Sequence, residues 1–174
     1  MSSTVEFPPT ALHDLLEEVT SLLKSRSETI SIAETACGGL LSSSLLSVPG
    51  ASSFYKGGLT LYTLESRLQY AGWTQSTISS YSGPTPEIVS GLASHVRGDL
   101  KSTYTLAESG TAGPTGGQTR NRKPGYVALA VDSEAGTFTR EVETGVGQRT
   151  ENMVAFAVEG LRFLRDVIKG DAKL

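Results

Sequence analysis

A glycine-led turn carries a carboxyl, a hydroxyl and a thiol group within seven residues, in the segment 33–39 (AETACGG). The turn lies between a predicted buried strand and a predicted helix, where free backbone N–H groups and the helix dipole favour an anion or an oxyanion. Glu34 and Thr35 are expected at the end of the strand, where ligands of α/β sheets usually bind. The alternative is a glycine-rich turn in which Thr35 caps the helix, and this segment alone leaves both interpretations open.

A second glycine cluster follows another predicted strand, in the segment 109–117 (SGTAGPTGG). Backbone N–H groups in such a loop can cradle a phosphate or a carboxylate. The segment is not a P-loop, because no Gly-Lys-Ser/Thr closes it, and it does not match GxGxxG. A flexible surface loop is the alternative interpretation of this segment.

Three further side chains could take part in chemistry. Tyr62 offers a hydroxyl at the end of a predicted strand, and Arg67 offers a fixed cation, although a half-buried tyrosine and a solvated arginine are commoner for each alone. Cys37 lies near a predicted helix N-terminus, where the pKa of a thiol falls. No histidine shares a motif with Cys37, so we interpret it as a small buried apolar residue.

Composition excludes several classes of protein. The chain has 174 residues, a net charge of −3 and a pI near 5.4, which argues against a nucleic-acid or anionic-membrane binder. One cysteine allows no intrachain disulfide, and two histidines without CxxC or HxxxH predict no metal site. No apolar run reaches the length of a membrane span, and the polar N-terminus lacks the apolar core of a signal peptide. We expect a cytoplasmic protein without a cofactor.

Strand and helix patterns alternate along the chain and then give way to a hairpin. Helices are predicted over 10–24, 39–48, 65–70, 86–101 and 149–167, and strands over 29–33, 58–63, 104–107, 126–131 and 137–142. This order predicts an α/β fold, a three-layer α/β/α sandwich with a mixed, mostly parallel sheet. The predicted domain spans 10–168, between a flexible segment 1–9 and a tail 169–174, and its one long loop spans 109–123.

Six segments in the same order resemble the CinA C-terminal domain family, whose best-known activity is nicotinamide mononucleotide (NMN) deamidase. They are 33–39 (AETACGG), 49–52 (PGAS), 58–63 (GLTLYT) with Arg67, 110–117 (GTAGPTGG), 123–125 (KPG) and 147–149 (GQR). The order holds from about Leu12 to Phe163. The resemblance implies a stand-alone form, without the nucleotide-pyrophosphatase-like domain that often precedes this one.

The resemblance also implies roles for individual residues. Thr35 stands at the position of the family's nucleophilic serine, and Arg67 stands at the position of the lysine that helps to activate it. An arginine is effectively always protonated and cannot act as a general base, but it can bind a phosphate or carboxylate with two hydrogen bonds. Tyr62, or a water molecule held by Glu34, would then serve as the base. The residues expected to bind the substrate are Gly38, Gly39, Thr111, Ala112, Gly113, Gly116, Gly117 and Arg149.

Three functions are consistent with these residues. The first is a small-molecule amidohydrolase that acts on NMN or a related amide. The second is a diverged enzyme of the same fold that uses acid–base chemistry on another small molecule. The third, ranked lower, is an inactive ligand-binding protein. The expected partner is a small, anionic substrate, and the resemblance also implies a homo-oligomer, most simply a dimer.

Overall fold

The computed structural model of the chain describes residues 6–173 and contains one five-stranded sheet. The strands are β1 (Ile30–Glu34), β2 (Tyr55–Thr60), β3 (Tyr104–Gly110), β4 (Tyr126–Ser133) and β5 (Gly136–Glu143). Their order is β2-β1-β3-β4-β5, with β1 parallel to both of its neighbours and β4 antiparallel to both of its own. Only β4 therefore runs against the other four strands, which confirms the mixed, mostly parallel sheet.

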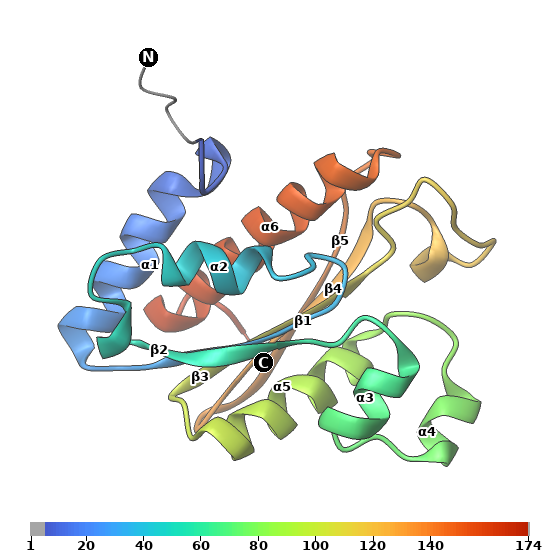
Figure 1. Ribbon diagram of the computed structural model, residues 1–174, viewed down its shortest axis with the longest axis horizontal. Helices are drawn as coiled ribbons and strands as arrows, with labels where there is room; N and C mark the ends of the chain where they lie inside the picture. The colour runs from blue at the N-terminus through green and yellow to red at the C-terminus, as the bar shows by residue number, and fades with distance from the viewer. Residues whose placement is uncertain (1–5, 174) are drawn as a thin grey trace.

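Helices cover both faces of this sheet, as the three-layer prediction requires (Figure 1). One face carries α1 (His13–Arg26), α2 (Leu40–Leu46) and α6 (Arg149–Lys169), and the other carries α3 (Leu64–Tyr70), α4 (Gln75–Ser80) and α5 (Pro86–Leu100). Each face has its own apolar core. Leu16, Ile32 and Phe156 belong to the core beneath α1, α2 and α6, and Ala33 and Leu92 belong to the core beneath α5.

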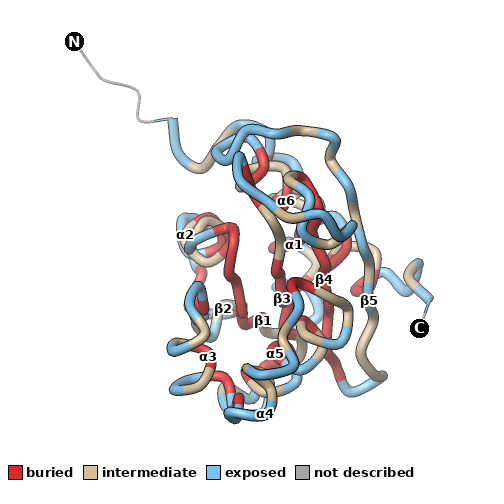
Figure 2. Tube along the Cα trace, turned by 90° about the vertical axis from the view of Figure 1, so that its right-hand side faces the viewer, coloured by how far each residue is buried: buried red, intermediate tan, exposed pale blue. Residues whose placement is uncertain are grey.

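The central strands are the most deeply buried part of the chain (Figure 2). Every residue of β1 and β4 is buried, whereas the two edge strands alternate between partly buried and exposed positions. A strand covered on both faces reads as a continuous apolar run, which explains why the sequence pattern located β1 and β4 well. Polar residues within β1 and β3 are therefore unusual, and they mark the functional region described below.

Three local predictions differ from the structure. The strand predicted over 58–63 is found at Tyr55–Thr60, because its pairing with β1 ends where β1 itself ends, at the pair Glu34–Thr60. Helix α4 was not predicted, since its sequence is rich in serine and threonine. It is stabilised by a capping box between Thr74 and Thr77.

The long loop predicted over 109–123 is shorter, because Ser109 and Gly110 pair with β4 and extend β3. A 3-10 turn, Arg120–Arg122, occupies its far end. Of the predicted flexible segment 1–9, residues 1–5 lie outside the described residues, as does Leu174 of the predicted tail. Within residues 6–173, no helix combines the length and apolar character that crossing a membrane requires.

Candidate functional site

Two hydroxyl groups meet at the carboxyl ends of the parallel strands β1 and β3. Glu34 of β1 lies in register with Glu108 of β3, so the residues that follow them, Thr35 and Ser109, are neighbours. Thr35 Oγ1 donates a hydrogen bond to Ser109 Oγ over 3.2 Å, and both residues are buried. The sequence predicted the position of Thr35 but not this partner, for which the only local signal is a serine directly before the glycine cluster.

The Glu34 side chain is fully buried and points to the start of α2. Its Oε2 accepts from the Leu41 N–H over 3.1 Å, and its Oε1 accepts from the Ser42 N–H over 3.0 Å. A carboxylate in this position satisfies N–H groups that the first turn of a helix leaves unpaired. Glu34 therefore holds α2 with both of its oxygens, and no hydrogen bond joins it to the Thr35 hydroxyl.

A second buried carboxylate, Glu108, was not predicted from the sequence. Its Oε2 accepts from the backbone N–H groups of Thr35 and Cys37, over 3.1 and 3.0 Å. Its Oε1 is buried and has no hydrogen-bond partner among the described residues. Burial raises the pKa of Glu108 to about 7, the two N–H groups oppose this rise, and the charge of Glu34 adds to it. The local signal is a glutamate inside an otherwise apolar strand.

These carboxylates correct the expectation that the N–H groups of the turn face outward to bind an anion. The N–H groups of Thr35 and Cys37 bond to Glu108, and the N–H of Gly38 bonds to the Thr35 carbonyl. Gly38 and Gly39 adopt left-handed backbone angles, with φ of 64° and 100°, which explains the choice of glycine. The Glu108 carboxylate therefore occupies the N–H groups that were expected to bind an anion from outside the protein.

Arg149, the first residue of α6, joins two segments that the sequence predicted to belong to the site. Its Nη1 donates to the Gly113 carbonyl over 3.0 Å, and its Nη2 donates to the Tyr62 hydroxyl over 3.1 Å. Tyr62 follows β2, its side chain is exposed, and its ring centroid lies 5.8 Å from the guanidinium carbon. The structure thus brings these three predicted residues together.

Arg67 lies away from solvent, with 4% of its surface exposed. Its Nε donates to the Leu61 carbonyl over 3.0 Å, and its guanidinium carbon lies 5.1 Å from the ring centroids of both Trp73 and Tyr81. Its Nη1 is buried without a hydrogen-bond partner among the described residues. The alternative interpretation of a solvated arginine is wrong, because the guanidinium is buried against the rings of Trp73 and Tyr81, which flank α4.

Backbone hydrogen bonds hold the second glycine cluster, 109–117, which we call the glycine loop. The N–H of Thr111 donates to the Tyr126 carbonyl and the N–H of Gly117 donates to the Arg122 carbonyl, so neither is available to a ligand in this conformation. A Cβ at Gly116 would clash with the backbone oxygen of Arg122, which explains why a glycine is needed there.

One side chain of α6, Asn152, ties the buried part of this loop to a neighbouring segment. It is fully buried, and its Nδ2 donates to the carbonyls of Ala112 and Val146 over 2.9 Å each. Its Oδ1 accepts from the Thr144 hydroxyl over 2.6 Å. No sequence pattern predicts this role, because Asn152 lies inside a helix far along the chain from the loop.

Cys37 is buried, and its thiol donates to the Met153 carbonyl over 3.6 Å. Burial raises the pKa of this thiol well above its usual value, and the charges of Glu108 and Glu34 raise it further. A thiol that stays protonated is a poor nucleophile. The interpretation of Cys37 as a buried apolar residue is therefore confirmed.

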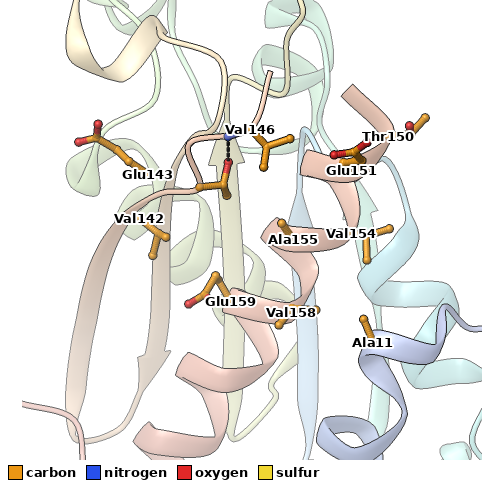
Figure 3. A pocket seen from close by; sticks show the side chains of 11 residues that line it. Ala11, Val142, Glu143, Val146, Thr150, Glu151, Val154, Ala155, Val158 and Glu159 are labelled. Atoms are coloured by element: carbon orange, nitrogen blue, oxygen red, sulfur yellow. Dashed lines mark hydrogen bonds between the residues drawn. The ribbon is translucent and has the colours of Figure 1, made fainter. Parts of the chain in front are cut away.

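Two cavities adjoin this region without containing its hydroxyl pair. One of about 490 Å³ is lined by Cys37, Gly38, Gly39, Leu40 and Met153, among others. Another of about 840 Å³ lies between α6 and β5 (Figure 3), with an apolar floor and the carboxylates of three glutamates around it. Within residues 6–173, no three histidine, cysteine, aspartate or glutamate side chains gather as a metal site would require.

Comparison with known proteins places these observations in a family. The model of the CinA C-terminal domain matches residues 12–168. A CinA-like protein of Shewanella amazonensis is 33% identical over 160 residues, which cover 91% of this chain and 37% of the relative. A CinA-like protein of Desulforapulum autotrophicum is 34% identical over 150 residues, covering 86% of this chain and 35% of the relative. The chain thus spans about a third of the length of these relatives.

Solved structures share the same fold. A competence or damage-inducible protein from Enterobacter asburiae superposes with a TM-score of 0.83 at 24% identity, covering 90% of this chain and 98% of that one. A competence/damage inducible protein from Agrobacterium tumefaciens superposes with a TM-score of 0.84 at 23% identity, covering 92% and 97%. At these identities, the likeness concerns the fold alone.

Proposed function

Because the chain belongs to the CinA C-terminal domain family, we propose that it is a small-molecule amidohydrolase that acts on NMN or a related amide. The observation that carries the proposal is the hydrogen bond from the Thr35 hydroxyl to Ser109 Oγ at the carboxyl edge of the sheet. The hydrogen bond orients the Thr35 oxygen at this edge and gives its proton an acceptor, which supports a role as a nucleophile.

The proposed reaction replaces the amide nitrogen of the substrate with oxygen. Thr35 Oγ1 attacks the carboxamide carbon and passes its proton to Ser109 Oγ, while the Ser109 hydroxyl passes its own proton to the departing amide nitrogen. Ammonia leaves with the relayed proton, and water then hydrolyses the ester to give the carboxylate and a proton and to restore the Thr35 hydroxyl. For NMN, the products are nicotinate mononucleotide and ammonia.

A cationic group held by the glycine loop and by Tyr62 supports an anionic substrate. Arg149 is oriented by the Gly113 carbonyl and by Tyr62, whose exposed side chain leaves this part of the site open to solvent. An arginine held in this way can bind a phosphate with two hydrogen bonds. We propose Arg149 and Tyr62 as substrate-binding residues.

A second candidate, acid–base chemistry without a covalent intermediate, is favoured by one observation. Arg67 occupies the position where the resemblance places a lysine, and its guanidinium lies over the rings of Trp73 and Tyr81. A permanently charged group cannot take the proton of Thr35. In this second reaction, Thr35 and Ser109 would only orient the substrate.

The two candidates differ in what Thr35 must do. The experiment incubates the protein with NMN and measures ammonia release and nicotinate mononucleotide formation. Under the first candidate, Thr35→Ser keeps or raises kcat, because a primary hydroxyl is less hindered, and Thr35→Ala abolishes turnover. Cys37→Ser is the matched control, two residues along the same turn, and should leave turnover near that of the unaltered protein.

Two results would contradict the proposal. Loss of turnover in Cys37→Ser with full activity in Thr35→Ala would make the thiol the nucleophile. Absence of turnover on NMN and on a panel of other small amides would remove the amidohydrolase and leave the second candidate.

Assembly of the chain is a separate proposal that rests on family membership. We expect a homo-oligomer, most simply a dimer, and a cytoplasmic location. Light scattering at micromolar concentration tests the first of these, and a monomer mass would count against it.

A further inference from the structure

We propose that Glu108 is a positioning residue for Thr35: its buried carboxylate holds the turn that carries the Thr35 hydroxyl, and catalysis requires that carboxylate to be ionised. The first clause concerns the fold of the turn. The second rests on the proposed amidohydrolase function, and the two are tested by different measurements below.

The geometry of the turn carries the first clause. A single oxygen of Glu108 accepts hydrogen bonds from the N–H groups of Thr35 and Cys37, on either side of one intervening residue. Hydrogen bonds between backbone N–H groups and a carboxylate are about twice as strong as those between neutral groups. The carboxylate therefore fixes the direction of the peptide unit from which the Thr35 side chain departs.

The two hydroxyls and the carboxylate lie on opposite faces of the sheet. In β3, Leu106 contributes to the core beneath α1, α2 and α6, whereas Ala107 contributes to the core beneath α5. Side chains alternate along a strand, so Glu108 shares the face of Leu106 and Ser109 shares that of Ala107. Glu108 does not touch the reacting hydroxyl, and it acts on Thr35 through the backbone.

The surroundings of Glu108 leave its charge poorly compensated. The charge that acts on it is that of Glu34, on the neighbouring strand, and the Cys37 thiol contributes a hydrogen bond that favours the ionised form. On the other side, β4 opposes it with Leu129, and α6 packs against this face of β3 with Phe156 beside Gly110. Helix α5, with its own titratable residues, covers the opposite face.

Opposing effects on the Glu108 pKa make this carboxyl group gain or lose its charge near neutral pH. Two N–H groups favour the ionised form, while burial, the charge of Glu34 and an unpartnered Oε1 oppose it. Protonation weakens Oε2 as an acceptor and so loosens the hold on Thr35 and Cys37. The hydrogen bond from Thr35 to Ser109 then loses its fixed geometry.

Glu34 provides a matched control, because it is equally buried and lies beside Glu108. It holds the N–H groups of Leu41 and Ser42, further along the same segment. Removing its charge should therefore alter the environment of Glu108 without removing any hydrogen bond to Thr35 or Cys37.

The first experiment records the backbone amide signals of Thr35 and Cys37 by 1H–15N correlation spectroscopy from pH 5 to 9. Both signals should titrate together with a midpoint near 7. In Glu108→Gln, which keeps an acceptor of the same shape, this titration should disappear. In Glu34→Gln, it should persist with a lower midpoint. Signals that do not titrate, or that titrate equally in Glu108→Gln, would overturn the first clause.

The second experiment measures kcat for amide hydrolysis against pH in the intact protein. At pH 5.5, an acid with a pKa near 7 is only about 3% ionised, so kcat should be about 30-fold lower than at pH 8. The ratio between the two pH values should approach one in Glu108→Gln. An unchanged ratio in Glu108→Gln would overturn the second clause. If the backbone N–H signals titrate as expected but no substrate amide is hydrolysed, the proposed function is overturned instead.

Discussion

Asn152 offers the sharpest test of how the glycine loop is held. Its side chain is fully buried and makes three hydrogen bonds, two donated to the Ala112 and Val146 carbonyls and one accepted from Thr144. Asn152→Ala removes all three, so the Ala112 and Val146 carbonyls lose this donor and Thr144 Oγ1 keeps only the bond that it accepts from the Val146 N–H. A buried partner without a hydrogen bond costs about 1–3 kcal/mol, and the partners nearer the surface cost less because water can replace the side chain.

We therefore expect the free energy of unfolding to fall by about 3 kcal/mol in Asn152→Ala. For a domain of this size, that corresponds to a loss of about 6–12 °C in Tm. Urea denaturation followed by circular dichroism measures the change. Thr144→Val is the comparison variant, because it removes the bond that Asn152 accepts and the bond that Thr144 Oγ1 accepts from the Val146 N–H, and it should cost about 1–2 kcal/mol.

A double-mutant cycle between these two positions adds a stricter condition. The double variant should be less stable than Asn152→Ala by only about 1 kcal/mol, because the bond between the two side chains is already absent and only the bond from the Val146 N–H to Thr144 Oγ1 is lost in addition. A loss below about 1 kcal/mol in Asn152→Ala, or equal losses in the two single variants, would refute this account of the loop.

Three more predictions follow from buried groups. Because the pKa of Glu108 is raised to about 7 in the folded protein, the folded state retains a proton that the unfolded state releases. The free energy of unfolding should fall by up to about 3 kcal/mol as pH rises from about 4.5 to 7, and Glu108→Gln should abolish this fall in denaturation curves. Arg67→Lys should cost about 1–2 kcal/mol by urea denaturation and change the emission of the single tryptophan, Trp73, since a point charge replaces the stacked guanidinium. Gly113→Ala should destabilise the protein in thermal melts, because φ is 87° and the new Cβ would stand 2.7 Å from a backbone oxygen, whereas Gly91→Ala, in open space on α5, should be neutral or stabilising.

The fold was predictable because its signals are local. The spacing of apolar residues within β1 and within α1 is enough to predict which of their residues are buried. The position of Thr35 then follows, because it comes directly after the end of β1. The end of β2 was misplaced because the length of its partner strand sets it. That information lies in pairing between segments, which no single window of sequence contains.

The site was predictable in part for the same reason. Thr35, Tyr62 and Arg149 could be named from the sequence, but the contacts of Glu108 depend on the register between β1 and β3. The burial of Arg67 depends on the rings of Trp73 and Tyr81, which are brought to it by the packing of α3 and α4 against each other. Residues whose role is set by a neighbour distant in the chain are the ones that sequence reasoning missed.

The distance along the chain between the turn and its carboxylate has a consequence for folding. Glu108 is separated from Thr35 by 73 positions and from Cys37 by 71. Contacts of such long range form only when the intervening chain closes into a loop, which costs conformational entropy. The turn therefore cannot reach its final form until β3 pairs with β1, so a nascent chain that lacks residues beyond α5 carries the Thr35 hydroxyl without the geometry that makes it useful.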